Sequence, residues 1–255
     1  MQKVLLLKKK VGETPLEIIS EFKKNNLEYQ NQKLGYAGRL DPMAEGLLLV
    51  LIGEECKKRK EYEKLSKIYE FEILFGISTD TFDVMGKIIK INPKPRISKE
   101  KLKDTSSKFI GRYLQEYPPY SSPRVKGKPL FWWAREKRLD EISIPKKTIE
   151  ISKLELITLR NINSEKLLKK IHEKIEIVKG DFRQKEILKI WDEKLKNKKL
   201  EFLIAKFSIK CSSGTYVRSI ANKIGENLKI PSLAFSIKRK EIGKFNLENI
   251  LIKGE

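Results

Sequence analysis

The chain has 255 residues, 40% of them hydrophobic, which is enough for one large domain or two small ones with a buried core. Its 55 lysines and arginines outnumber 34 acidic residues, and this net charge of +21 favours a polyanionic partner, above all nucleic acid, over a merely lysine-rich surface. No apolar run approaches the ~18 residues of a membrane-spanning helix, and two distant cysteines with one histidine indicate a reduced, cytoplasmic protein without a disulfide framework or a structural zinc site.

The N-terminal part is predicted to begin with a strand over residues 4–7. Residues 14–17, Thr-Pro-Leu-Glu, form a capping box with proline at the first helical position, so a helix should start there. Asp41 directly before Pro42 is also a typical N-cap sequence, and on local grounds we predict a second helix start at this point.

Two strands and a helix are expected next. The continuous apolar run over residues 47–52 indicates a strand buried on both faces. The alternation over residues 69–75 indicates a strand with its aromatic residues on one face. Ser98 is expected to cap a helix that runs to about Phe109.

Basic and aromatic residues interleave between residues 118 and 135, as they do on surfaces that bind single-stranded RNA. Trp132 and Trp133 fit such a surface and fit equally well the core side of a helix. In the C-terminal part of the chain, the pattern predicts strands over residues 149–157, 202–211 and 234–242. It also predicts a helix over residues 164–178, a second helix capped by Asp181, and a third after Gly214-Thr215.

Five short motifs stand in a characteristic order along the chain. They are Gly35-Tyr36-Ala37-Gly38-Arg39-Leu40-Asp41-Pro42, Lys67-Ile68-Tyr69, Thr79-Asp80-Thr81-Phe82-Asp83, Pro118-Pro119-Tyr120-Ser121-Ser122 and Gly214-Thr215-Tyr216-Val217-Arg218. Together they span most of the chain and resemble the bacterial tRNA pseudouridine synthase B (TruB) family.

The resemblance implies an α+β pseudouridine synthase fold, with a central mixed, mostly antiparallel sheet flanked by helices. Family members commonly carry a C-terminal RNA-binding domain of the PUA type. The chain stops soon after Ile242, so we expect one catalytic domain over residues 1–255 without that domain. Residues 164–197 form a helical hairpin that looks longer than the family's connection, and we interpret it as an insertion. Its lysine-rich outer faces are either a solvated surface or an additional RNA contact.

The resemblance also assigns the chemistry. Asp41 would be the catalytic carboxylate, held ionised by the guanidinium of Arg218. Tyr69 would stack on a flipped-out uracil and take the proton from C5. The isomerisation needs no metal and no cofactor, and none is expected here.

Four further residues match substrate-binding positions of the family. Tyr216 and Ile237 would line the uracil pocket, and Lys9 would lie in a loop that contacts RNA. Tyr36 stands where the family often has histidine, and its ring could also stack to open the RNA loop. The substrate implied is uridine 55 in the T-stem-loop of tRNA, bound by a monomer.

Two alternatives remain open at this stage. Arg39 gives the loop an Arg-Leu-Asp string that other pseudouridine synthase families share, so the target could be another RNA such as rRNA. The chain could also be a non-catalytic RNA-binding or RNA-chaperone protein. The presence of Asp41, Tyr69 and Arg218 together favours the enzyme.

Overall fold

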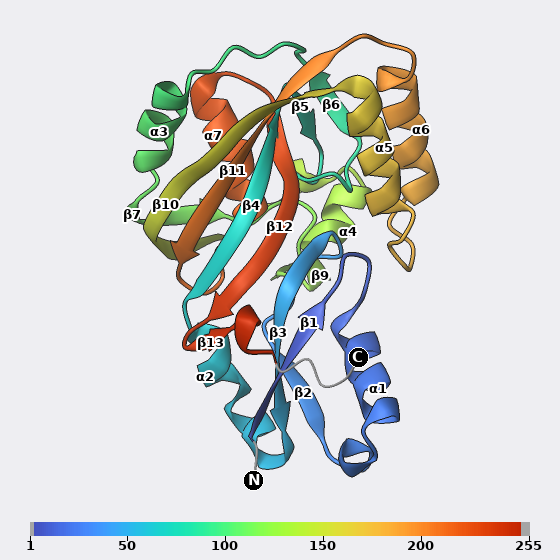
Figure 1. Cartoon of the computed structure of the whole chain (residues 1–255), viewed down its shortest axis with the longest axis vertical. Helices are drawn as coiled ribbons and strands as arrows, with labels where there is room; N and C mark the ends of the chain where they lie inside the picture. The colour runs from blue at the N-terminus through green and yellow to red at the C-terminus, as the bar shows by residue number, and fades with distance from the viewer. Residues whose placement is uncertain (1–2, 251–255) are drawn as a thin grey trace.

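A computed structural model describes residues 3–250 and shows a long twisted sheet with helices packed along it (Figure 1). Seven strands follow the order β1-β3-β12-β4-β11-β10-β7, while β2 pairs with β3 and β13 pairs with β12. Only β12 and β3 run parallel; the other pairs in this sheet are antiparallel. The expected α+β fold with a mixed, mostly antiparallel sheet is confirmed.

The elements have these bounds. The main sheet contains β1 Val4–Lys9, β2 Leu34–Ala37, β3 Ala44–Ile52, β4 Lys67–Phe75, β7 Gly111–Glu116, β10 Lys146–Asn163, β11 Glu201–Cys211, β12 Ser232–Ile242 and β13 Phe245–Asn246. Two small sheets pair β5 Ile77–Thr79 with β6 Ile88–Ile91, and β8 Arg124–Val125 with β9 Lys128–Pro129. The α-helices are α1 Pro15–Asn25, α2 Arg59–Lys64, α3 Lys99–Ser107, α4 Leu130–Arg135, α5 Ser164–Ile175, α6 Gln184–Leu195 and α7 Val217–Leu228. No helix among residues 3–250 is long and apolar enough to cross a membrane.

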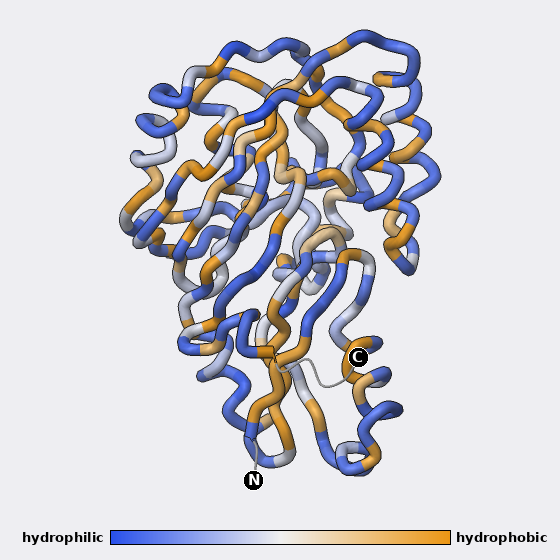
Figure 2. Tube along the Cα trace, viewed as in Figure 1, coloured by the Kyte–Doolittle hydropathy of each residue, from blue (hydrophilic) through white to orange (hydrophobic). Residues whose placement is uncertain are grey.

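Strand β3 is buried on both faces, as its apolar run predicted. Leu48 and Val50 pack on one side with α1, and Leu47, Leu49 and Leu51 pack on the other. The remaining core lies between the centre of the sheet and helices α3, α5, α6 and α7. Figure 2 shows hydrophobic residues along the central strands and hydrophilic residues over the outer helix faces.

Several local predictions are confirmed. Thr14 and Glu17 form the predicted capping box at the start of α1, with Thr14 N donating to Glu17 Oε2 at 2.8 Å. Ser98 caps α3 by accepting a hydrogen bond from Lys101 N at 3.1 Å. The strand predicted over residues 149–157 is present but longer, because β10 continues to Asn163 beside β11.

Two predicted helix starts are wrong. Asp41-Pro42 opens no helix; it belongs to a turn whose chain enters β3 at Ala44, because pairing with β1 and β12 takes up that backbone. Asp181 does not cap α6. The N-cap is Arg183, in the left-handed conformation at φ 64°, and Asp181 Oδ1 instead accepts from Arg183 N at 3.2 Å.

Helices α5 and α6 form the expected hairpin, and its inner face belongs to the main core. Leu167, Ile171, Ile175 and Trp191 are fully buried in the same cluster as the central strands. Trp191 Nε1 also donates to the Gly86 carbonyl at 3.2 Å. Removing the whole hairpin would therefore expose the core, so its role must be tested by single substitutions.

The parallel contact between β3 and β12 depends on a glycine. Gly46 pairs with Arg239 at φ 115°, and a Cβ atom at this position would stand 2.6 Å from Arg239 N. We expect Gly46→Ala to lower the free energy of unfolding by at least about 2 kcal/mol, because strain and backbone collision combine. Urea denaturation measures the loss.

Gly53→Ala is the matched control, since Gly53 also has positive φ, at 57°, but no atom of residues 3–250 lies within 4 Å of its Cβ position. It should cost only about 1 kcal/mol, the price of the left-handed backbone. Equal losses in the two variants would show that close packing against Arg239 is not what requires glycine at position 46.

Candidate active site

Buried hydrogen-bond donors hold the loop that carries Asp41. Pro42 O accepts hydrogen bonds from Gly12 N at 2.9 Å and from Lys9 Nζ at 3.3 Å. Lys9 Nζ also donates to Ala44 O at 2.6 Å, and burial lowers the pKa of this ammonium to about 8. Lys9 is fully buried, so it supports the loop from inside the protein, and the structure gives it no surface from which to contact RNA.

Arg218 points into this loop from the first turn of α7. Its Nε donates to Asp41 Oδ2 at 3.1 Å, Nη1 to Thr81 O at 2.8 Å and Nη2 to Tyr120 O at 2.7 Å. The Arg218 side chain is only 4% exposed, whereas that of Asp41 is 34% exposed. One carboxylate is thus fixed against a buried positive charge while it still faces solvent.

Asp83 is a second carboxylate beside the same guanidinium, at 4.0 Å from Arg218 Nε. Its Oδ1 accepts from Thr81 Oγ1 at 2.6 Å and from Met85 N at 2.9 Å. Burial raises its pKa to about 6, although Arg218 and these hydrogen bonds oppose the rise. Asp83 ends the Thr79–Asp83 motif, and the sequence alone predicted no role for it.

The aromatic and apolar candidates lie around this pair. Tyr69 is buried on β4, and burial raises the pKa of its phenol, with the charge of Asp41 adding to the rise. Tyr216 precedes α7, 5.7 Å from the Arg218 guanidinium, and burial raises its pKa to about 12. Ile237 on β12 pairs with Ala44, just after the loop. The structure therefore brings Tyr69, Tyr216 and Ile237 to the surroundings of Asp41.

Tyr36 has a different setting on β2. Its hydroxyl accepts from Arg39 Nη2 at 3.2 Å, and the Arg59 guanidinium lies 5.2 Å from its ring centroid. The ring is partly exposed and stands on the same strand-and-loop segment that leads to Asp41. This placement leaves its predicted stacking role as a prediction.

Arg239 is a structural residue that sequence reasoning missed. It is 1% exposed, and it donates from Nε to Leu47 O at 2.8 Å and from Nη2 to Gly38 O at 3.1 Å. These bonds join β12 to Gly38, just before the Asp41 loop, and to Leu47 within β3. An arginine in a strand of alternating polarity is normally predicted to lie on the surface, and nothing in the sequence indicates that Arg239 is buried.

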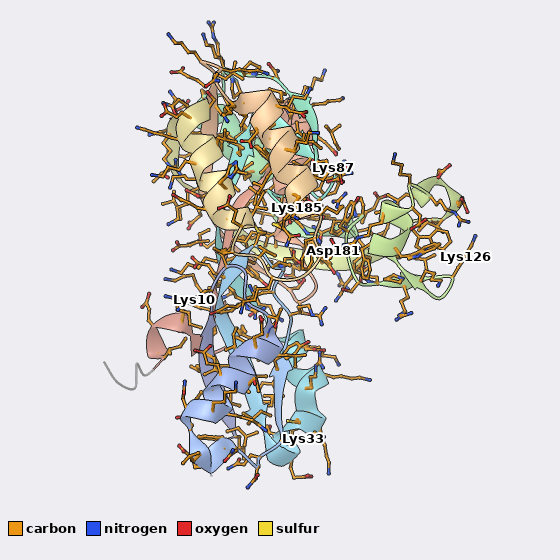
Figure 3. All side chains as sticks on the ribbon, turned by 90° about the vertical axis from the view of Figure 1, so that its right-hand side faces the viewer. Lys10, Lys33, Lys87, Lys126, Asp181 and Lys185 are labelled. Atoms are coloured by element: carbon orange, nitrogen blue, oxygen red, sulfur yellow. The ribbon has the colours of Figure 1, made fainter. Side chains whose placement is uncertain are left out.

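The two neighbouring tryptophans differ in burial. Trp133 is 6% exposed and donates from Nε1 to Val125 O at 3.2 Å. Trp132 is partly exposed, with Lys128 Nζ 5.3 Å and the Arg138 guanidinium 5.7 Å from its ring centroid. The segment that carries them projects from the body of the molecule (Figure 3), and its contact with RNA stays a prediction.

No group of three or more histidine, cysteine, aspartate or glutamate side chains that could hold a metal ion occurs within residues 3–250. The described site is instead built from one half-exposed carboxylate, a buried guanidinium, a buried carboxylate and aromatic rings. Such a site suits charge stabilisation and nucleophilic attack on a planar base or its sugar.

Solved structures first identify the class of fold. The chain aligns with one in the crystal structure of a Cbf5-Nop10-Gar1 complex (TM-score 0.57, 16% identity), covering 96% of this chain and 50% of that one. It also aligns with one in an H/ACA RNP bound to a substrate RNA containing 2'-deoxyuridine (TM-score 0.54, 16% identity, 96% and 48% covered). Our chain spans about half the length of these chains, and the likeness shows the fold alone.

The sequence comparisons identify the family. The model of the TruB family pseudouridylate synthase (N terminal domain) matches residues 24–180. The tRNA pseudouridine synthase B of Caldanaerobacter subterraneus subsp. tengcongensis is 32% identical over 246 residues, covering 96% of this chain and 70% of that protein. That of Endomicrobium trichonymphae is 30% identical over 249 residues, covering 97% and 88%. The chain therefore belongs to the TruB family of pseudouridylate synthases, which makes it an isomerase.

The raised pKa of Asp83 gives a pH-dependent stability. Because its pKa in the folded state, about 6, exceeds the ordinary 3.8, the folded protein binds a proton that the unfolded chain binds only at lower pH. The contribution of Asp83 to stability should thus rise as pH falls from 7 to 5. We expect the free energy of unfolding of the wild type to gain about 1 kcal/mol over that of Asp83→Asn across this range.

Urea titrations of both proteins at several pH values measure this difference. The contributions of the other carboxylates to the pH dependence are the same in both proteins and therefore cancel. The amide of asparagine keeps an oxygen for Thr81 and Met85. A difference that stays constant from pH 7 to pH 5 would show that Asp83 remains ionised throughout.

Proposed function

We propose that this protein isomerises a flipped-out uridine of RNA to pseudouridine, most directly uridine 55 in the T-loop of tRNA, with Asp41 as the catalytic carboxylate. The observation that carries the proposal is the pairing of a solvent-facing Asp41 with a buried Arg218 at 3.1 Å. The names of the curated relatives, tRNA pseudouridine synthase B, support tRNA as the substrate. The two free cysteines fit a cytoplasmic setting.

The reaction conserves the atoms of the uridine. The bond between uracil N1 and ribose C1′ breaks, the base turns, a bond forms between C5 and C1′, and the C5 proton leaves while N1 gains one. The guanidinium of Arg218 holds the Asp41 carboxylate in place, and a carboxylate can attack C1′ or stabilise a positive charge that develops there. No redox step or energy source is required.

The neighbouring residues would hold the extruded base. Tyr69 offers a ring on which uracil can stack, with Ile237 and Tyr216 as further walls of the pocket. Because burial raises the pKa of Tyr69, its phenol stays protonated near neutral pH. Tyr69 would then act through its ring and as a hydroxyl that takes the C5 proton while it gives its own proton to water, and not as a phenolate.

The proposal predicts the result of Asp41→Asn. The amide is nearly isosteric and keeps a hydrogen-bond acceptor for Arg218, but it is not a nucleophile. Single-turnover assays on a T-stem-loop RNA should show turnover lost, by far more than tenfold, with RNA affinity nearly unchanged. A loss below about tenfold, or about 1.4 kcal/mol of barrier, would exclude Asp41 as the catalytic carboxylate.

Mapping of pseudouridine in total tRNA and rRNA, from cells with and without the protein, separates the possible targets. Loss of pseudouridine at a single tRNA position supports the proposed substrate. Loss confined to rRNA would keep the chemistry and move the target. No change at any site would favour the non-catalytic RNA-binding alternative.

Binding should depend steeply on salt, because the chain carries a net charge of +21 and an RNA substrate is a polyanion. Each phosphate neutralised on single-stranded RNA contributes about −0.7 to the slope of log K against log salt concentration. Four or more contacts would give a slope of about −3 or steeper. Titrations of tRNA at several salt concentrations measure it, and a flat dependence would mean that the positive charge serves solubility.

A further inference from the structure

The tip of the helical hairpin, residues 176–183, contacts two parts of the protein. One supports the loop that carries Asp41, and the other is the Tyr120 segment that binds Arg218. Asp181 is found in Figure 3 where the hairpin, the N-terminal elements β1 to β3 and the projecting α4 segment meet. Arg135 Nη2 of α4 donates to Asp181 O at 2.8 Å. Lys179 Nζ of the tip pairs with Glu17 of α1 at 3.3 Å. The tip thus contacts elements that are far apart in the sequence.

One side of the tip supports the Asp41 loop through Gly12. A Cβ atom on Gly12 would stand 2.9 Å from the Ile177 carbonyl carbon, so these two backbones are in close contact. Gly12 has φ 87°, a conformation that glycine adopts readily. Its N–H donates to Pro42 O at 2.9 Å, one residue after Asp41.

The other side of the tip supports Arg218 through Arg183. Arg183 Nη1 donates to Asp80 Oδ2 at 2.9 Å and to the Tyr120 hydroxyl at 2.8 Å. Its guanidinium also lies 4.4 Å from the centroid of the Tyr120 ring. The carbonyl of Tyr120, in turn, accepts the bond from Arg218 Nη2 at 2.7 Å.

Arg183 differs from the lysines that cover the outer faces of the hairpin. Its side chain is only 17% exposed, and its donors point at acceptors within the protein. Its backbone has φ 64°, which an arginine adopts only where the surroundings require it. Tyr120 lies in an irregular segment without helix or strand, so the position of its carbonyl depends on how its side chain is anchored.

We propose that Arg183 is a positioning residue for pseudouridine formation. By fixing Tyr120 it orients Arg218 and, through Arg218, the carboxylate of Asp41. The hairpin tip therefore positions both members of the catalytic pair: Asp41 through the contact with Gly12, and Arg218 through Tyr120. The inference rests on the proposed function, since it concerns the rate of that reaction.

Arg183→Gln tests the inference, with Arg160→Gln as the matched control. Arg160 also pairs with a carboxylate, Glu72, at 2.8 Å, but on the sheet surface. For Arg183→Gln we expect the single-turnover rate at saturating T-stem-loop RNA to fall about tenfold, with the dissociation constant changed less than twofold. Arg183→Lys, which keeps the charge beside Asp80 but lacks the planar fork, should recover part of the rate. Arg160→Gln should retain the wild-type rate.

Tyr120→Phe provides a second, independent measurement, because it removes only the hydroxyl and leaves the ring and the carbonyl. It should slow the reaction, and the double variant with Arg183→Gln should be no slower than Arg183→Gln alone, since both act through one contact. Strictly additive effects would overturn the proposed route through Tyr120. If Arg183→Gln does not fold by circular dichroism, Tyr120→Phe and Arg183→Lys decide the question.

The competing role for Arg183 is direct contact with an RNA phosphate. In that case Arg183→Gln would weaken binding, reduce the salt slope by about 0.7 and leave the rate at saturation unchanged. That result, or no effect on either quantity, would overturn the inference. Failure of the proposed function looks different, because the wild-type protein itself would then form no pseudouridine.

Discussion

The burial of the Arg218 guanidinium is the constraint on which the site depends. A buried cation is tolerated only when its donors and its charge are satisfied, since desolvation costs several kcal/mol. Here two carboxylates and two carbonyls supply the partners, from segments near residues 41, 81–83 and 120. Three loops distant in sequence must therefore converge on the first turn of α7, and their convergence forms the site.

The two carboxylates around Arg218 occupy unequal environments. Asp83 is 4% exposed and is satisfied by Thr81 and Met85 in addition to the guanidinium, so burial dominates and raises its pKa. Asp41 has the direct 3.1 Å bond and an open side toward solvent. Unequal surroundings give two similar groups different tasks. The exposed one can meet a substrate, and the buried one balances charge.

Local structure was predictable from the sequence where one short segment contains the whole signal. The capping box at Thr14, the cap at Ser98 and the two-sided burial of β3 are of this kind. Asp41-Pro42 failed as a helix start because its local preference yields to sheet pairing that involves β1 and β12. The internal hydrogen bonds of Lys9, Arg183 and Arg239 were not predictable, because a basic residue in a basic chain shows no sign of which acceptors will surround it.

Part of the net positive charge of the chain belongs to side chains that are bonded inside the protein. Lys9, Arg183, Arg218 and Arg239 have donors bonded to acceptors within the protein, and all of them except Arg183 are almost inaccessible to solvent. Charges used in this way can raise the potential near the site, but they are poorly placed to neutralise phosphates one by one. Under the proposed function, the salt dependence of RNA binding would come from exposed lysines and arginines, whereas these internally bonded cations would hold the geometry of the Asp41–Arg218 pair. Affinity and rate would thereby rest on separate groups of basic residues, and a substitution in either group should change mainly one of the two.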